Sequence, residues 1–301
     1  MTISLSIVIP SASRPDLLRV CLKSVLKYAP RGTEVVVVDD GSPAGRVSRV
    51  ANEFAGVTSL RFSTRRGFCI AANAGLKAAT NRIVELLNDD TEVTPGWAEP
   101  AVAAFDDPTV AAVAPLTLIG PQHSGRPRID SAGDAYDRGG FARKCGHNIF
   151  LSNDYLISKE VFGASGCSAF LRRDLILRLG AFPSHFRAYF EDVDLAHRIH
   201  RAGYRVLYVP ESRVWHQVGS SHGKPNRQLL SQQSRNEERV FWRNPSDRPL
   251  ARLIPRHVAV LCAKTVRRWS EGLLLPWLMG RLAAFFEIPS MLRHRCGTSQ
   301  T

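Results

Sequence analysis

A run of four valines that ends in two adjacent aspartates is the feature that most constrains the fold of this chain. The run occupies residues 35–38 and is followed by Asp39 and Asp40. Consecutive β-branched residues are typical of a strand that is buried on both faces of a parallel sheet. Residues 5–10 and 83–87 are similar short apolar runs, with helical patterns between them. This alternation predicts an α/β fold with a doubly wound, mostly parallel sheet flanked by helices.

Two clusters of acidic residues follow strands of the predicted sheet. Asp39 and Asp40 follow one strand, and Asp89 and Asp90 follow another. Ligands bind at the carboxyl ends of strands in open α/β sheets, and a divalent cation relieves the repulsion between neighbouring carboxylates. A capping aspartate at a loop-to-helix junction is the alternative for each pair. Two clusters in one sheet favour a binding site.

The remaining segments complete the predicted topology. Helices are expected over residues 68–80 and 191–202, and a strand over residues 205–209. The polar segment 120–153 predicts loops and short strands, where we expect substrate-specific structure. From residue 226 the pattern is helical and basic.

Several functional classes lack their usual signature. The chain has no GxGxxG after the first strand, no GxxxxGK[ST] and no CxxC pair. The N-terminus has no basic region before its apolar run, so it predicts a strand and not a signal peptide. The apolar segment 272–289 is too short and too charged to predict a transmembrane helix. Nothing predicts disulfides, so we expect a cytoplasmic protein.

The motifs together resemble family 2 glycosyltransferases, which have the GT-A fold. The resemblance covers residues 4–245 and is especially close to rhamnosyltransferase-like and galactofuranosyltransferase-like bacterial members. The motifs that carry it are Ser6-Ile-Val-Ile-Pro10, Val36-Val-Val-Asp-Asp-Gly-Ser42, Arg66-Gly-Phe68, Asn73-Ala-Gly75, Leu86-Leu-Asn-Asp-Asp-Thr91, Phe190-Glu-Asp-Val-Asp-Leu195 and Trp215-His-Gln-Val-Gly-Ser220.

The resemblance implies a donor half over residues 1–118, an acceptor half over 119–225, and a helical basic extension over 226–301. In the donor half it implies metal binding by Asp90 of the DXD-like motif, with His216 as a further ligand of Mg²⁺ or Mn²⁺. The residues that it implies on the nucleotide side are Pro10, Ser11, Asp39, Gly67, Asn73, Asn88 and Asp89. A capping role for the acids and a core role for the histidine are the alternatives.

On the acceptor side, the resemblance implies that Asp192 is the general base of an inverting transfer. It also implies that Glu191, Gly166 and Trp215 lie near the acceptor. First-turn acids that complement a helix dipole, and a tryptophan that only packs, are the alternatives. Cys167 is expected to be a small buried residue.

Two departures leave the nucleotide open. Ala12 stands where an aromatic residue is common in the family, and Ala72 stands where some members have a base-contacting arginine. Within this limit, the resemblance implies a UDP- or dTDP-sugar donor and a glycan or lipid-linked acceptor, in cell-surface polysaccharide synthesis.

The net charge of +13 is concentrated near the C-terminus. Residues 223–301 hold 14 Lys and Arg against 5 Asp and Glu, a difference of 14 − 5 = +9. Arg281 falls on the helical side of Trp277 and Phe285, where its stem could extend toward lipid headgroups. An anionic surface on the inner face of the cytoplasmic membrane is one expected partner, and a helical cap or dimer surface is the alternative.

Two other classes compete. A nucleotidyltransferase that makes nucleotide sugars shares a similar scaffold, but it would show a Gly-rich loop with a basic residue after the first strand. Residues 11–14 contain no glycine. A nucleic-acid-binding protein is suggested by charge alone, and the chain has no RNP motif, zinc spacing or clear helix-turn-helix, so no nucleic-acid partner is expected.

Overall fold

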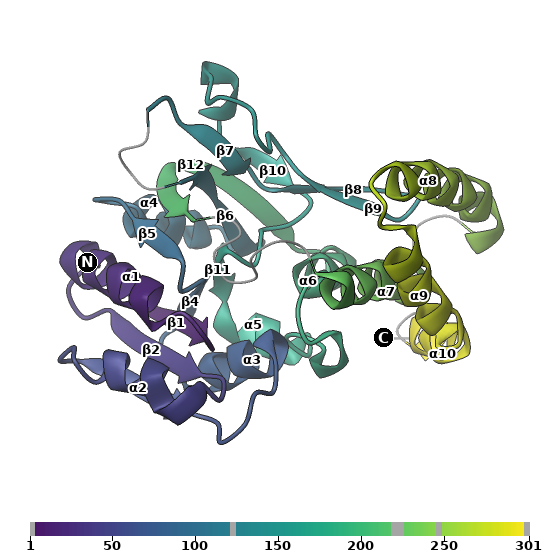
Figure 1. Cartoon of the computed structure of the whole chain (residues 1–301). Helices are drawn as coiled ribbons and strands as arrows, with labels where there is room; N and C mark the ends of the chain where they lie inside the picture. Colours follow the sequence, from purple (N-terminus) through teal and green to yellow (C-terminus); the bar gives the residue numbers. More distant parts are fainter. Residues whose placement is uncertain (1–3, 121–124, 218–225, 245–248, 298–301) are drawn as a thin grey trace.

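The computed structural model describes residues 4–120, 125–217, 226–244 and 249–297, and its centre is one large twisted sheet (Figure 1). Two short strands, β5 (Thr91–Val93) and β7 (Arg128–Ser131), pair with β12 and β6 beside the main order. The main order is β10 (Lys159–Val161), β12 (Arg205–His216), β6 (Val110–Ile119), β11 (Ser168–Arg172), β4 (Ile83–Leu87), β1 (Leu5–Ser11), β2 (Glu34–Asp39) and β3 (Val57–Arg61).

Six of the eight strands in this order run in the same direction. Strands β3, β2, β1 and β4 form parallel pairs, and β6 pairs with β12 in parallel. Strand β11 is antiparallel to both β4 and β6, and β10 is antiparallel to β12. The expected mostly parallel sheet is confirmed, with β11 inserted between its two parallel parts.

The valine run explains why helices cover both faces of the sheet. Val36 and Val38 belong to one buried apolar cluster, and Val35 and Val37 belong to the other. The first cluster is closed by α3 (Phe68–Ala78), α5 (Arg173–Arg178) and α6 (Glu191–Arg201). The second is closed by α1 (Pro15–Tyr28), α2 (Arg46–Ala51) and α4 (Ala98–Ala103). Successive side chains point to opposite faces, so both faces of β2 are buried.

One segment differs from the sequence-based expectation, and the segment 120–153 agrees with the loops and short strands expected there. Strand β12 continues past Val209 to His216, where a strand over 205–209 was expected, and its pairing with β6 shifts between Val209 and Arg213. This irregularity accommodates Pro210, which has no N–H for the ladder. The segment 120–153 contains β7 and a separate hairpin of β8 (Asp134–Asp137) and β9 (Phe141–Lys144).

The C-terminal part is helical, as expected. It comprises α7 (Arg227–Arg243), α8 (Leu250–Ser270), α9 (Leu274–Phe285) and α10 (Ile288–Gly297). Helix α9 packs closely on α7 because Gly280 has no side chain, and a Cβ there would lie 2.2 Å from the backbone oxygen of Ser231. Within the described ranges, no helix combines the length and the apolar character needed to cross a bilayer.

The expected outward direction of Arg281 is wrong. Its side chain is only 10% exposed and contacts Glu237 and Glu238 of α7. Its guanidinium also lies 5.0 Å from the ring centroid of Trp277, which is itself buried. The two glutamates attract the guanidinium inward, so much of the C-terminal positive charge is compensated inside the protein.

Candidate active site

Strand pairing brings the predicted metal ligands together. Strand β5 pairs with β12 so that Thr91 lies opposite His216. Asp90 directly precedes β5, and its Oδ1 atom lies 3.2 Å from Nε2 of His216. At the same edge of the sheet, Ser11 at the end of β1 is in register with Asp39 at the end of β2. The carboxyl ends of the strands therefore form the site that the acidic clusters predict.

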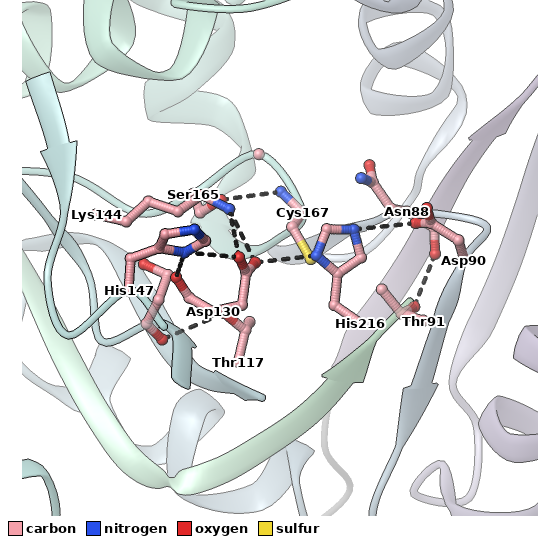
Figure 2. A network of polar contacts seen from close by, with 12 residues as sticks. Asn88, Asp90, Thr91, Thr117, Asp130, Lys144, His147, Ser165, Cys167 and His216 are labelled. Carbon is pink, nitrogen blue, oxygen red and sulfur yellow. Dashed lines mark hydrogen bonds and ion pairs between the residues drawn. The ribbon is translucent and has the colours of Figure 1, made fainter. Parts of the chain in front are cut away.

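Asp130 of β7 holds the second ring nitrogen of His216 (Figure 2). Its Oδ2 atom lies 2.9 Å from His216 Nδ1. Asp130 is fully buried and also accepts from Lys144 Nζ at 2.8 Å, while His147 Nδ1 lies 3.3 Å from its Oδ1. Although burial opposes ionisation, the two histidines and the lysine hold the pKa of Asp130 well below its usual range. The sequence does not mark Asp130, because no motif includes it.

This donor set suits a hard divalent cation. Metal-binding histidines commonly donate one ring N–H to a carboxylate, which leaves the other nitrogen for the metal, and Asp130 and Asp90 flank His216 in this way. Burial alone would lower the pKa of His216, but its contacts with Cys167, Asp130 and Asp90 raise it. A cation at Nε2 would therefore displace a proton. A carboxylate and an imidazole nitrogen together offer donors for a divalent cation.

A second possible donor set shares the same histidine. The ligand atoms of Asp130, Cys167 and His216 lie within 4.8 Å of one another, and all three residues are buried. However, Lys144 places its ammonium group on Asp130, which disfavours a further cation there. Burial raises the pKa of the Cys167 thiol, which disfavours the thiolate that binds metal. The Asp90 side of His216 is therefore the better cation site.

Asp39 has a structural role in the adjoining loop. Its carboxylate is fully buried and accepts from the N–H and hydroxyl of Ser42, at 2.7 and 3.0 Å. It also accepts from the N–H and hydroxyl of Ser48 at 3.1 and 2.7 Å, at the start of α2. These bonds match the capping role that the sequence left open. Contact with a nucleotide base stays a prediction for Asp39.

Asp40 joins this loop to the segment before α3. It accepts from the backbone N–H groups of Arg66 and Gly67 at 2.6 and 2.9 Å. Gly41, at φ +67°, permits the approach, because a Cβ there would lie 2.4 Å from the backbone carbon of Thr64. The structure thus places Gly67 against the acidic loop, although the sequence does not single out Asp40 for this role.

The other predicted nucleotide-side residues lie around the same edge. Ser11 donates to Asp89 at 2.5 Å, and burial raises the pKa of Asp89 to about 7 against the effect of this hydrogen bond. Pro10 is buried at the end of β1. Asn73 uses both amide atoms on the backbone of Phe182, at 2.7 and 2.9 Å. The assignment of these residues to a nucleotide site stays a prediction.

Asp192 is the most exposed of the three acids in the first turn of α6, because Glu191 and Asp194 are buried. It lies in the first turn of α6, is partly exposed, and accepts from the Gly166 N–H at 2.9 Å. Glu191 beside it is buried, and burial together with the charge of Asp192 raises its pKa well above the usual range. Burial and the charge of Asp192 also raise the pKa of Asp134, which the sequence does not single out.

The short turn at residues 165–167 links the predicted base to the predicted metal pair. Gly166 contacts Asp192, and the Cys167 carbonyl accepts from the Asn88 N–H at 2.8 Å. Cys167 also lies beside the His216 ring (Figure 2). A Cβ on Gly166 would lie 3.5 Å from Asp192 Oδ2, an ordinary contact distance, so Gly166 lies directly against the carboxylate of Asp192. Residues from the predicted donor and acceptor halves therefore meet at this turn.

The segment before α6 is strained and is held from a distance. Non-glycine residues with positive φ are rare and costly, and they concentrate at functional sites. Three occur here in four positions, namely Arg187 (φ 60°), Tyr189 (φ 72°) and Phe190 (φ 66°). Asn236 of α7, fully buried, donates to the carbonyls of residues 186, 188 and 189 at 2.9–3.0 Å. Gln232 of α7 donates to two of the same carbonyls.

Trp215 does not offer an open ring to an acceptor. It is 8% exposed and belongs to a buried apolar cluster of the sheet. Packing, the alternative left open by the sequence, is therefore its evident role, and acceptor contact stays a prediction. The part of its motif from Val218 onward lies outside the described residues.

The curled, mostly parallel sheet with acids at its strand ends defines a GT-A type fold. The sequence profile described as "Glycosyl transferase family 2" matches residues 6–180. The chain therefore belongs to family 2 of the glycosyltransferases. A mannosyltransferase from Pyrobaculum calidifontis, solved in complex with GDP-Man and Mn²⁺, superposes with a TM-score of 0.59 at 19% identity, covering 95% of this chain and 86% of that one.

Curated relatives have similar but longer chains. The pre-mycofactocin glycosyltransferase of Mycobacterium tuberculosis is 30% identical over 217 residues, which cover 70% of this chain and 42% of the relative. The O-antigen biosynthesis protein RfbC of Myxococcus xanthus is 26% identical over 233 residues, which cover 73% of this chain and 18% of the relative. The chain thus spans less than half the length of these relatives.

Proposed function

We propose that this glycosyltransferase moves a sugar, with inversion, from a UDP- or dTDP-sugar to a hydroxyl of a glycan or lipid-linked acceptor. The observation that carries the proposal is the pairing of Asp90 with His216, separated from Asp192 only by the turn at 165–167. This arrangement offers a cation site and a proton acceptor on two sides of one small region. The motif spacing further supports a rhamnosyltransferase-like member.

The chemistry needs both sides of this site. A divalent cation, Mg²⁺ or Mn²⁺, neutralises charge on the departing nucleoside diphosphate when it is bound. Asp90 and His216 would hold it, and Asp130 orients the imidazole. Asp192 takes the proton from the attacking acceptor hydroxyl, a contribution of about 10²–10⁴-fold in such reactions. Burial and the charge of Asp192 raise the pKa of Glu191, which favours Asp192 over Glu191 as the base.

The biological setting is part of the proposal. We place the reaction in bacterial cell-surface polysaccharide synthesis, at the inner face of the cytoplasmic membrane. The relative RfbC is named for O-antigen biosynthesis, which supports a polysaccharide pathway. The competing nucleotidyltransferase is not retained, because the family profile matches a glycosyltransferase over residues 6–180.

Incubation with a panel of nucleotide sugars tests the proposal. We expect release of nucleoside diphosphate from one donor, abolished by a chelator and restored by Mg²⁺ or Mn²⁺. The Asp90→Asn variant should bind donor weakly in the presence of metal, while retaining the wild-type melting temperature. Full activity in excess chelator, with metal shown to be absent, would rule out the cation site.

A further inference from the structure

We propose that the outer faces of α8 and α9 form a docking surface for an anionic lipid bilayer. Figure 1 shows α8, α9 and α10 at the edge of the molecule farthest from β1 and β2. The outer apolar face, as we call this surface, is centred on Trp269, Leu275, Met279, Leu282, Phe285 and Phe286.

Helix α9 differs from an ordinary surface helix, because its exposed side is apolar and its single charged residue lies on the buried side. A surface helix normally turns its apolar stripe to the core and its charges to water. In α9 the buried side includes Trp277 and Arg281, and the guanidinium of Arg281 is held by two glutamates of α7. Leu275 and Phe285 on the other side are 65% and 64% exposed. The core of the protein therefore does not account for the apolar side of α9.

The exposed side of α9 contains no charge. Residues 273–286 have Arg281 as their single charged residue, and it points inward. Every residue of this segment that is exposed is apolar, up to Phe286 at 81%. A continuous exposed apolar surface of this kind marks an interaction site.

Helix α8 adds positive charge beside this apolar side. Only Leu253 and His257 of its 21 residues are buried. It contains no acid, and its cations are Arg252, Arg256, Lys264, Arg267 and Arg268. Arg256 pairs with Asp137 and Lys264 pairs with Glu237, so the helix with these two acids and Glu271 keeps a charge of 5 − 3 = +2. Arg267 and Arg268 share Glu271, so at this end two cations meet one acid. Trp269, 74% exposed, lies between these arginines and α9.

The positive charge of α8 favours an anionic lipid surface as the partner of the outer apolar face. Anionic headgroups attract a basic helix whose apolar residues enter the interface, which is the usual arrangement of interfacial helices. A second copy of this chain would bring the same arginines together, so charge disfavours it. The 12 residues of α9 span roughly 18 Å, well below the roughly 30 Å of a bilayer core. Helix α9 is therefore suited to lie along the interface.

The inference deepens the proposed function, because a surface on lipid would bring the enzyme to a lipid-linked acceptor. Its test is independent of sugar transfer, since binding is measured without donor or acceptor. Loss of vesicle binding would overturn the docking surface alone, and transfer to a water-soluble acceptor would still report on the transferase.

Trp269 provides the readout. The structure describes all five tryptophans, and of these only Trp269 is largely exposed to solvent. Mixing the full chain with phosphatidylcholine vesicles that contain phosphatidylglycerol should shift its emission to the blue and cause cosedimentation. The double variant Phe285→Ser, Phe286→Ser should lower partitioning by about tenfold or more, because two aromatic side chains no longer enter the interface. The matched control is Ile157→Ser, which removes an apolar residue, 65% exposed, far from these helices in sequence.

A second arm tests the charge. Arg267→Gln with Arg268→Gln should weaken binding to the anionic vesicles, and so should added salt. Removal of two exposed cations of the donor half, Lys27→Gln with Arg31→Gln, should not. Unchanged melting temperatures would show that the variants are folded.

Three results would overturn the proposal. They are the absence of vesicle binding by the wild type, equal binding to vesicles of phosphatidylcholine alone, and normal binding by the Phe285→Ser, Phe286→Ser variant. If the wild type does not bind vesicles but self-associates, and the Phe285→Ser, Phe286→Ser variant does not self-associate, the occupant of the surface is a second copy of the chain.

Discussion

The two sides of the active site are held in place by different means. On the metal side, backbone pairing between β5 and β12 sets Asp90 beside His216. On the base side, the strained segment before α6 is tied down by side chains of α7, chiefly Asn236. The metal side therefore depends on the sheet itself, whereas the base side depends on a helix that follows it by about 40 residues in the chain.

The largest expected effect separates the two sides directly. Asp192→Asn removes the proton acceptor and should lower turnover by about 10²-fold or more, with donor affinity nearly unchanged. Asp90→Asn should weaken metal-dependent donor binding as well as turnover. Donor titration by calorimetry, with and without metal, and initial rates provide the measurement.

If Asp192→Asn loses donor binding as severely as Asp90→Asn, the assignment of separate roles is wrong. Near-normal turnover in Asp192→Asn would move the base to Glu191 or Asp194. Melting temperatures of both variants within a few degrees of wild type would exclude general unfolding as the cause.

The next effect tests how far the metal side depends on a side chain outside the sheet pairing. Asp130→Asn weakens the partner that orients His216 and should lower metal affinity or activity by about 10–100-fold. Metal titration of donor binding measures this change. His147→Gln is the matched control, because His147 contacts Asp130 without touching His216, and its effect should be clearly smaller. Equal losses in Asp130→Asn and His147→Gln would show that Asp130 supports the local structure and does not act by orienting His216.

A smaller loss of turnover is expected when the hydrogen bonds that hold the base side of the site are removed. Asn236→Ala removes three hydrogen bonds to the strained segment, so Asp192 should be less well positioned and kcat should fall by about tenfold. The KM for donor should change little, because the metal pair is untouched. Gln232→Ala, which removes two hydrogen bonds to the same segment, should lower kcat by less and should also leave the KM for donor nearly unchanged. A large rise in donor KM would contradict the separation of the two sides.

The smallest effect on activity concerns the stability of the sheet that supports the metal side. Burial raises the pKa of Glu85 in β4 from 4.5 to about 7, against hydrogen bonds from Trp97 and Ser168. Because this folded-state pKa is raised, the stabilisation is present below about pH 4.5 and is lost as pH rises through about 7. The loss amounts to roughly 3 kcal/mol at most.

Glu85→Gln should therefore flatten the decline in the free energy of unfolding between about pH 5 and pH 7. Chemical denaturation at several pH values measures it. Glu34→Gln is the control, since hydrogen bonds from Ser6 and Thr80 lower the pKa of Glu34 despite its partial burial. An unchanged slope in Glu85→Gln would show that Glu85 does not titrate in this range.

These differences also explain what the sequence could predict. The valine run and the acids after it are local patterns, so the sheet and the acids at its edge could be predicted from the sequence, whereas the pairing of Asp90 with His216 was implied by the family resemblance. Asp130 and Asn236 act across 86 and 47 residues, on His216 and Tyr189 respectively, and no local pattern reports such contacts. The inward direction of Arg281 was missed for the same reason, because its partners, Glu237 and Glu238, lie in another helix.

The hydrogen bonds from Asn236 also bear on how the chain could change in evolution. The family profile ends at residue 180, yet the shape of segment 187–190 depends on α7. A recombination event that exchanged the C-terminal helices between relatives would separate this amide from the carbonyls that it holds. We therefore expect α7 and segment 187–190 to be inherited as one unit.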